Sequence, residues 1–131
     1  MFATLTRADE ATRRLRSRNT VLIVDDEEGI CETLRDVFEG EGYTVCTVGN
    51  GRDALAVMEE LPVKPCVVIL DMIMPILDGN GVYRAMKADP DLADIPILIS
   101  TSDPSQAPDG VLIMRKPIAV DVLVAAVRRC C

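Results

Sequence analysis

Short apolar runs alternate along this chain with longer segments in which apolar residues recur every three or four positions. A continuous apolar run of four or more residues predicts a strand buried on both faces, and the longer spacing predicts a helix with one buried side. Strands are predicted at 21–24, 43–48, 67–70, 97–100 and 111–114. Helices are predicted at 28–40, 54–61 and 80–88, and from a cap residue at Asp121 onward.

This alternation predicts an α/β fold, a parallel sheet covered by helices on both faces. Five short strands favour a flavodoxin-like three-layer sandwich with strand order 2-1-3-4-5. The segment 102–110 joins the last two strands and contains Pro104 and Pro108. A helical crossover needs at least roughly 10–12 residues, and proline disfavours a helix interior. The fourth helix is therefore predicted to be missing or replaced by a loop.

The 131 residues suit one compact domain, and charge divides the chain into two parts. Residues 1–20 carry five arginines against Asp9 and Glu10, a net charge of +3, which leaves −10 for the rest from a total of −7. We therefore predict a basic N-terminal extension at 1–19 and a folded domain at 20–131. The acidic body argues against nucleic acid as a direct partner of the folded domain.

The chain has five cysteines and no histidine, which excludes imidazole metal sites and catalytic triads built on this chain alone. An odd cysteine count without metal-site spacing predicts a reducing, cytoplasmic location rather than a disulfide framework. Cys31, Cys46 and Cys66 are expected to pack as small apolar residues, and Cys130 and Cys131 end the sequence. No apolar run reaches membrane-spanning length and no apolar leader is present, so no membrane partner is expected.

Polar residues follow four of the predicted strands at their carboxyl ends, which meet at one edge of such a sheet. They comprise three carboxylates, two hydroxyls and one ammonium: Asp25 and Asp26 after the first strand, Asp71 after the third, Ser100 and Thr101 at the fourth, and Lys116 after the fifth. Each alone is weak, because acidic pairs commonly cap helices and a lysine before proline is commonly a surface residue. What indicates a functional site is that all of these residues stand at the correct strand ends.

These residue types suit phosphoryl chemistry. Three adjacent carboxylates repel one another, so a cation is implied, and oxygen ligands favour Mg²⁺. A carboxylate can attack phosphorus, while Mg²⁺ and a lysine neutralise the charge of the transferring group. A threonine hydroxyl can bond an attached phosphoryl oxygen.

With these residues in view, the sequence resembles the response-regulator receiver family over roughly 20–129. The resemblance is carried by VLIVDDEE (21–28), VVILDMIMPILDG (67–79), IPILIST (95–101) and MRKPI (114–118), of which the second is the most specific. It implies a domain of two-component signalling that accepts a phosphoryl group from a sensor histidine kinase or a histidine phosphotransfer protein. The domain then signals through a downstream protein and is not a turnover enzyme. Homodimer formation is left open.

The resemblance also implies residue roles. Asp71 accepts the phosphoryl group, Thr101 is the switch hydroxyl, and Lys116 contacts the phosphoryl group through a loop whose Lys116–Pro117 bond is cis. Mg²⁺ is held by Asp26, by Asp71 and by the backbone carbonyl of Ile73, with Asp25 holding a metal-bound water. Ile113 stands where the family usually has an aromatic residue, so the usual coupling between hydroxyl and aromatic side chain is in doubt.

Three alternatives stay open. The chain is equally suited to be a receiver module cut from a larger hybrid kinase. A Mg²⁺-dependent phosphohydrolase with an aspartyl nucleophile is disfavoured, because such enzymes commonly carry an aspartate two residues after the nucleophile, where this chain has Ile73. A receiver-like docking module without phosphorylation is disfavoured by the intact set of acidic residues, threonine and lysine.

Overall fold

The computed structural model describes residues 19–131, in which strands and helices alternate. The predicted extension at 1–19 lies outside the described residues except for Asn19. Within residues 19–131 the helices are too short or too polar to span a bilayer. The elements in chain order are β1 (Thr20–Val24), α2 (Glu28–Gly40), β2 (Thr44–Val48), α3 (Gly51–Glu60), β3 (Val67–Asp71), α4 (Gly79–Ala88), β4 (Ile97–Thr101), η1 (Pro104–Gln106), β5 (Leu112–Arg115) and α5 (Val120–Cys130).

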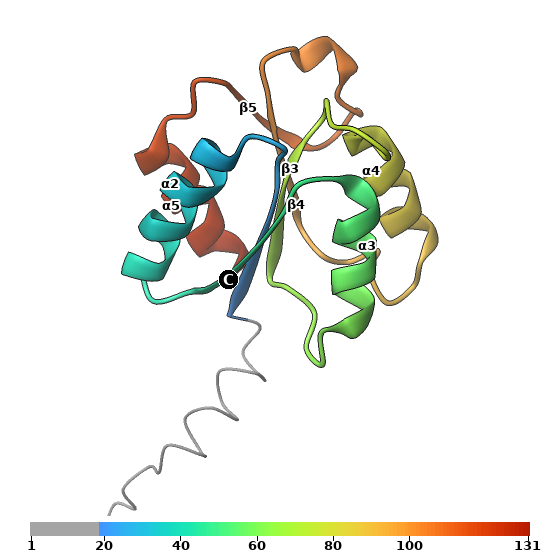
Figure 1. The fold of residues 1–131 in the computed structure, drawn as a ribbon, viewed down its shortest axis with the longest axis horizontal. Coiled ribbons are helices and arrows are strands. Elements are labelled where there is room, and N and C mark those ends of the chain that lie inside the picture. The colour runs from blue at the N-terminus through green and yellow to red at the C-terminus, as the bar shows by residue number, and fades with distance from the viewer. Residues whose placement is uncertain (1–18) are drawn as a thin grey trace, which may run out of the picture.

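The strands form one parallel sheet in the order β2-β1-β3-β4-β5, as the alternating pattern predicted. Helices α2 and α5 cover one face, and α3 and α4 cover the other (Figure 1). The three inner strands are almost wholly buried, which explains why they read as uninterrupted apolar runs. The result is the predicted flavodoxin-like arrangement, with all five strand ends at one edge.

Two apolar clusters lie on the two faces of the sheet. The cluster under α2 and α5 is centred on Ile23, Phe38 and Ile69, and the cluster under α3 and α4 on Leu22, Met58 and Leu70. Because side chains alternate across a strand, consecutive residues of β1 and β3 enter opposite clusters. Both faces therefore hold β1 and β3 rigidly, and these strands carry the acidic residues at their ends.

The prediction that the fourth helix is missing or replaced by a loop is wrong. Residues 19–131 contain four α-helices, α2 to α5, and the segment 102–110 itself contains the 3-10 helix η1. The side chain of Asp103 accepts hydrogen bonds from the backbone N–H of Ser105 at 3.1 Å and from its hydroxyl at 2.6 Å, and Pro104 occupies the first turn. An Asp-Pro pair starts a helical turn, and one such turn needs far fewer residues than an α-helical crossover.

Helix α5 also differs from its prediction. It begins at Val120 after Ala119, which makes no side-chain cap bond, and Asp121 stands inside the first turn. There the negatively charged carboxylate interacts favourably with the positive end of the helix dipole, although it does not cap the helix. By contrast, Asn50 and Asp78 do cap α3 and α4, accepting from backbone N–H groups three residues later.

The expectation for Cys66 is overturned as well. Cys66 is joined to Cys131 by a disulfide, with Cα atoms 5.3 Å apart. Cys66 immediately precedes β3 and Cys131 follows α5. The disulfide therefore joins, at one end of the sheet, two residues that are 65 positions apart in sequence. Among the described residues, Cys31, Cys46 and Cys130 are free and half-buried.

Candidate functional site

Three carboxylates converge at the carboxyl edge of the sheet. Asp25 and Asp26 follow β1, Asp71 ends β3, and one oxygen from each lies within 4.8 Å of the others. Asp25 and Asp71 are only 4% and 5% exposed, whereas Asp26 faces solvent. They meet because β1 and β3 are paired neighbours, with Val24 opposite Leu70. The donor set consists of oxygens alone at one open corner, which fits a hard divalent cation.

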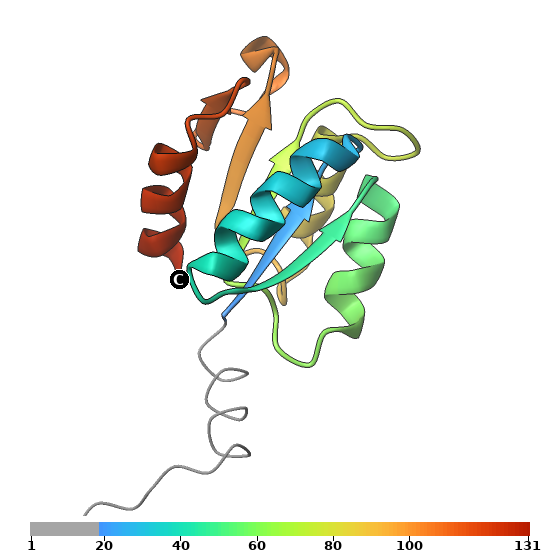
Figure 2. The ribbon, with the colours of Figure 1, turned by 60° about the vertical axis from the view of Figure 1, so that its left-hand side comes forward.

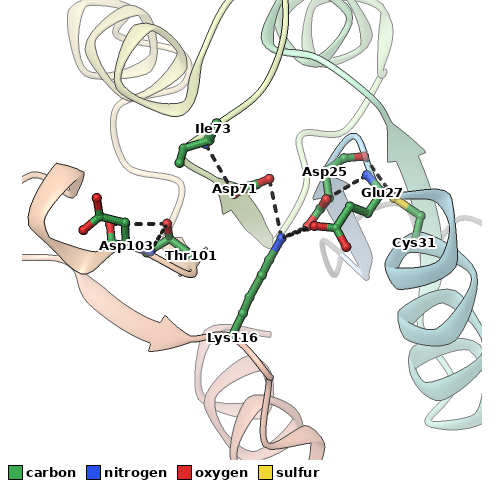
Figure 3. A network of polar contacts seen from close by, with 8 residues as sticks. All are labelled: Asp25, Glu27, Cys31, Asp71, Ile73, Thr101, Asp103 and Lys116. Carbon is green, nitrogen blue, oxygen red and sulfur yellow. Dashed lines mark hydrogen bonds and ion pairs between the residues drawn. The ribbon is translucent and has the colours of Figure 1, made fainter.

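Lys116 brings a positive charge into this cluster from the end of β5. Its Nζ lies 2.9 Å from Asp25 Oδ2, 3.5 Å from Asp71 Oδ2 and 3.5 Å from Glu27 Oε1 (Figure 3). The Lys116 N–H donates to Thr101 O at 2.9 Å, which extends the pairing of the last two strands by one residue.

The Lys116–Pro117 peptide bond is cis, as the family resemblance implied.

Burial and charge act in opposite directions on these groups. Burial raises the pKa of Asp71, and the charge of Asp25 raises it further, while Lys116 and the Ile73 N–H pull it down without reversing the shift. Burial also disfavours the ammonium of Lys116. The hydrogen bond and charge of Asp25, with the charges of Asp71 and Glu27, outweigh that effect and raise the pKa of Lys116. The site therefore holds more negative charge than its one ammonium neutralises.

Backbone groups hold the two buried carboxylates in position. The Glu27 N–H donates to Asp25 Oδ1 at 2.9 Å, and the Ile73 N–H donates to Asp71 Oδ1 at 3.3 Å. The Ile73 side chain is 59% exposed, so its contribution to the site comes through its backbone. Each aspartate accepts from the residue two positions later, a local arrangement that leaves its second oxygen free to face Lys116.

Two residues next to Asp25 were not predicted from the sequence. Glu27 pairs with Lys116, and the Cys31 thiol donates to the Asp25 backbone carbonyl at 3.3 Å. Burial, followed by the charge of Asp25, raises the pKa of Cys31 to about 11, so the thiol stays protonated and serves as a donor. Glu27 lies within the quoted VLIVDDEE motif, whereas Cys31 becomes a neighbour only because the first turn of α2 folds back over β1.

Thr101 lies apart from the acidic residues in this conformation. Its side chain is fully buried, and its Oγ1 accepts from the Asp103 N–H at 3.2 Å and lies 3.4 Å from the Asp103 carbonyl (Figure 3). The hydroxyl is therefore bonded to the start of η1 rather than to Asp71 or Lys116. Ile113, at the position usually aromatic in the family, is 37% exposed on β5.

Ser100 is the second hydroxyl that the sequence placed at this edge. It is 3% exposed and lies beside Asp71 in the pairing of β3 with β4. Its Oγ has no hydrogen-bond partner within residues 19–131. Laterally paired residues of a parallel sheet project to the same face, so this hydroxyl lies on the same side of the sheet as the Asp71 carboxylate.

The chain then turns tightly from β3 into α4. Ile76 has a φ of 70° and is 70% exposed, an unusual backbone conformation for a β-branched residue. Gly79 packs so closely that an added Cβ would lie 2.4 Å from the Asp71 carbonyl oxygen. This turn therefore depends on the absence of a side chain at Gly79, directly behind Asp71.

A hollow of about 730 Å³ opens beside the cluster, between α2 and the segment that leads into α5. Glu27, Ile30, Lys116, Pro117 and Ile118 are among its lining residues, so Lys116 lines both the hollow and the acidic site. The hollow and the acidic site thus share Glu27 and Lys116.

The fold and the site together define a class of protein: a doubly wound α/β domain with an oxygen-only acidic cluster and one lysine at its carboxyl edge. The model of the response regulator receiver domain matches residues 21–128, and this chain belongs to that family. It is a receiver domain of two-component signalling.

Relatives and solved structures agree with this assignment. The chain is 35% identical over 85 residues to the DNA-binding response regulator MtrA of Mycobacterium tuberculosis (strain ATCC 25618 / H37Rv), a match that covers 65% of this chain but only 35% of MtrA. Its structure resembles the receiver domain of a signal transduction histidine kinase from Syntrophus aciditrophicus, with a TM-score of 0.75, 32% identity, and coverage of 86% of this chain and 89% of that one.

A third similar structure contains a bound metal ion. The receiver domain of sensor histidine kinase PA1611 from Pseudomonas aeruginosa PAO1 was solved with a magnesium ion coordinated in its active site cleft. It superposes with a TM-score of 0.75 at 22% identity, over 85% of this chain and 95% of that one, which shows a shared fold.

Proposed function

We propose that Asp71 is the phosphoryl acceptor of this receiver domain. The observation that carries the proposal is a buried carboxylate at the end of β3, flanked by Asp25 and Asp26 and paired with Lys116 at 3.5 Å. One Asp71 oxygen attacks phosphorus, a P–O bond forms, and the bond from phosphorus to the donor's nitrogen or oxygen breaks. The leaving group takes the electron pair of that bond and picks up a proton from solvent.

Residues around Asp71 have separate tasks in this proposal. Lys116 lies close enough to Asp71 Oδ2 to contact the negatively charged oxygens of a phosphoryl group attached to Asp71. Thr101 exchanges its bonds with Asp103 for a bond to a phosphoryl oxygen, which makes it the switch hydroxyl. Mg²⁺ fits the donor set, with Asp26, Asp71 and the Ile73 carbonyl as ligands and Asp25 holding a metal-bound water. When bound, the cation offsets the negative charge that one ammonium leaves uncompensated.

The rival hydrolase reading is weaker on structural grounds. Two residues after Asp71 stands Ile73, an apolar side chain that is 59% exposed and has no proton to give or take. At that position the chain therefore lacks the acid/base group that such a hydrolase needs to turn over phosphorylated substrates. A docking module without phosphorylation would have no need of two buried carboxylates and a shared lysine, which are unfavourable to bury without a task.

The partners follow from the chemistry and remain part of the proposal. A sensor histidine kinase or a histidine phosphotransfer protein supplies the phosphoryl group in the cytoplasm, and a protein effector reads the result. Because the match covers about a third of MtrA, attachment to a further domain is as compatible with the sequence as a separate receiver. We take 20–131 as the receiver domain itself.

Phosphorylation by acetyl phosphate with Mg²⁺ tests the assignment through intact mass. We expect one phosphoryl group per chain in the wild type and none on Asp71→Asn. Asp36→Asn is the matched control, since Asp36 is an exposed aspartate on α2 outside the cluster. Equal rates of modification for Asp71→Asn and the wild type would rule out Asp71 as the acceptor.

The metal and switch roles need separate measurements. Asp26→Ala is expected to weaken Mg²⁺ binding, followed by chemical shifts during titration, and unchanged binding would remove Asp26 from the ligand set. Thr101→Ala is expected to accept the phosphoryl group but to lose capture of an effector in a beryllium fluoride pull-down. Capture equal to that of the wild type would exclude Thr101 as the switch.

A further inference from the structure

The end of the sheet opposite the acidic cluster holds a covalent link between two elements. Cys66 stands directly before β3, is 3% exposed, and its N–H donates to the Thr20 carbonyl at 2.9 Å. Cys131 follows α5, is exposed, and forms the disulfide with Cys66. The C-terminus lies beside the start of β1 in both views (Figures 1 and 2). The link therefore ties the last turn of α5 to the amino edge of the sheet.

Non-covalent contacts also hold that last turn, because the half-buried Cys130 packs against the apolar cluster under α2 and α5. The buried residues of α5 are Leu123, Val124 and Val127, all before its final three positions. Arg128 pairs with Glu41 at 2.8 Å, but both side chains are exposed, and such surface pairs contribute little. The disulfide is thus the covalent restraint on the end of α5, added to the packing of Cys130 and to this surface pair, and its presence or absence changes how firmly that end is held.

The structure also accommodates the reduced form. Cys66 Sγ lies 3.3 Å from the Thr20 carbonyl oxygen. A disulfide sulfur has no proton for that oxygen, but a thiol at Cys66 would donate to it without any movement. Opening the link therefore leaves no unpaired polar group at this buried position. Cys131, on the other side of the bond, is exposed at the end of the helix, where a small thiol can reach it.

We propose that Cys66–Cys131 is a reversible redox latch that fixes the end of α5 to the sheet when oxidised and releases it when reduced. Receiver domains act with cytoplasmic phosphodonors in the function proposed above, and disulfides of reducing compartments are usually transient and redox-sensing. The latch is independent of Asp71, which lies at the opposite end of β3.

The reaction is thiol–disulfide exchange with a low-molecular-weight disulfide such as oxidised glutathione. The exposed Cys131 thiolate attacks one sulfur of that disulfide, forms a mixed disulfide and releases one small thiol. Cys66 then loses its proton to solvent and displaces the second small thiol from Cys131. Two protein thiols are oxidised, one small disulfide is reduced to two thiols, and excess reduced glutathione drives the reverse steps.

Thiol counting and thermal melting of the full chain in glutathione buffers test the latch. After alkylation, the mass is expected to show two fewer reactive thiols in oxidised than in reduced buffer. The oxidised form is expected to melt higher by roughly 10 °C or more, because the link closes a long loop in the unfolded chain. Amide exchange at 128–131 is expected to be slower in the oxidised form, while labelling by acetyl phosphate changes less than about twofold, since the latch is remote from the acidic cluster.

Two variants separate the latch from general cysteine effects. Cys131→Ser changes an exposed residue that follows α5 and is expected to melt like the reduced wild type in both buffers. Cys130→Ser is the matched control, since Cys130 is the adjacent free thiol, and it is expected to keep the full difference.

Failure to form the bond in oxidised glutathione would overturn the proposal. So would a bond that survives excess reduced glutathione, since that would be a permanent cross-link. Loss of the melting difference in Cys130→Ser with its retention in Cys131→Ser would assign the effect to another pair. None of these results depends on whether Asp71 accepts a phosphoryl group, so the two proposals fail separately.

Discussion

Lys116 lies closer to Asp25 than to Asp71: its Nζ is 2.9 Å from Asp25 Oδ2 and 3.5 Å from Asp71 Oδ2. The contact with Asp25 joins residues 91 positions apart. In this conformation Asp25 is the main partner of the ammonium, and Asp71 shares it. Lys116 therefore neutralises part of the negative charge of the acidic cluster. For the same reason it competes with any cation that binds there.

Removing that ammonium should change two measurements in opposite directions. We expect Lys116→Ala to bind Mg²⁺ several-fold more tightly, because a competing positive charge is gone, yet to accept the phosphoryl group about 10²-fold more slowly. Titration followed by chemical shifts and the rate of labelling by acetyl phosphate measure the two effects. Lys87→Ala is the control, since Lys87 is an exposed lysine on α4. A parallel fall in both quantities would contradict this view of Lys116.

Asp71→Asn should stabilise the domain in the absence of divalent cations. The pKa of Asp71 is raised by burial and by Asp25, so folding disfavours the charged form relative to the unfolded chain. An amide of the same shape removes that repulsion, and unfolding free energy is expected to rise by about 1 kcal/mol. Urea unfolding with a chelator present measures the change, and Asp36→Asn should leave it near zero. A less stable Asp71→Asn would mean that attraction to Lys116 outweighs the repulsion.

Gly79 and Gly40 should respond to alanine in opposite ways. A Cβ at Gly79 would meet the Asp71 carbonyl oxygen at 2.4 Å and the Met72 Cα at 2.7 Å, so Gly79→Ala is expected to lower unfolding free energy by about 1–3 kcal/mol. Nothing lies within 4 Å of a Cβ at Gly40, the last residue of α2. Gly40→Ala should therefore raise it by up to about 1 kcal/mol. Similar values for both variants in urea unfolding would show that the turn behind Asp71 can yield.

Ser100→Ala should not destabilise the domain. The Ser100 hydroxyl is buried without a partner among residues 19–131, and removing such a group is expected to leave unfolding free energy unchanged or raise it by about 1 kcal/mol. Thr101→Ala is the comparison, since its hydroxyl is bonded to Asp103 and its loss should destabilise by about 1 kcal/mol. A clear loss of stability in Ser100→Ala would reveal a buried water on that hydroxyl.

Local pattern was sufficient for most of the fold. The strands were predictable because a strand buried on both faces must be apolar throughout, which is a property of four or five consecutive residues. Their parallel order followed from the alternation with helices, and that order predicts Asp25, Asp26, Asp71 and Lys116 at one edge. The structure brings these four together.

Boundaries and caps were less predictable than the elements. The segment 102–110 is too short for an α-helical crossover, but Asp103 and Pro104 start a single helical turn there. Asp121 was predicted as a cap, although α5 begins one residue earlier. In both cases the competing conformations differ by one or two local hydrogen bonds, a margin that pattern alone does not resolve.

Tertiary structure alone decided which distant polar groups meet. Nothing in the spacing of Cys66 and Cys131 indicates a pair, since their proximity requires β3 to start and α5 to end at the same edge of the sheet. The bond from Thr101 to Asp103 in place of Asp71, and the contact of Glu27 with Lys116, are likewise set by rotamers in the folded state. The sequence determined which residues reach the acidic edge, because backbone topology follows from hydrophobic pattern. The folded state determined which of them bond there, because those choices depend on distances of a few tenths of an ångström.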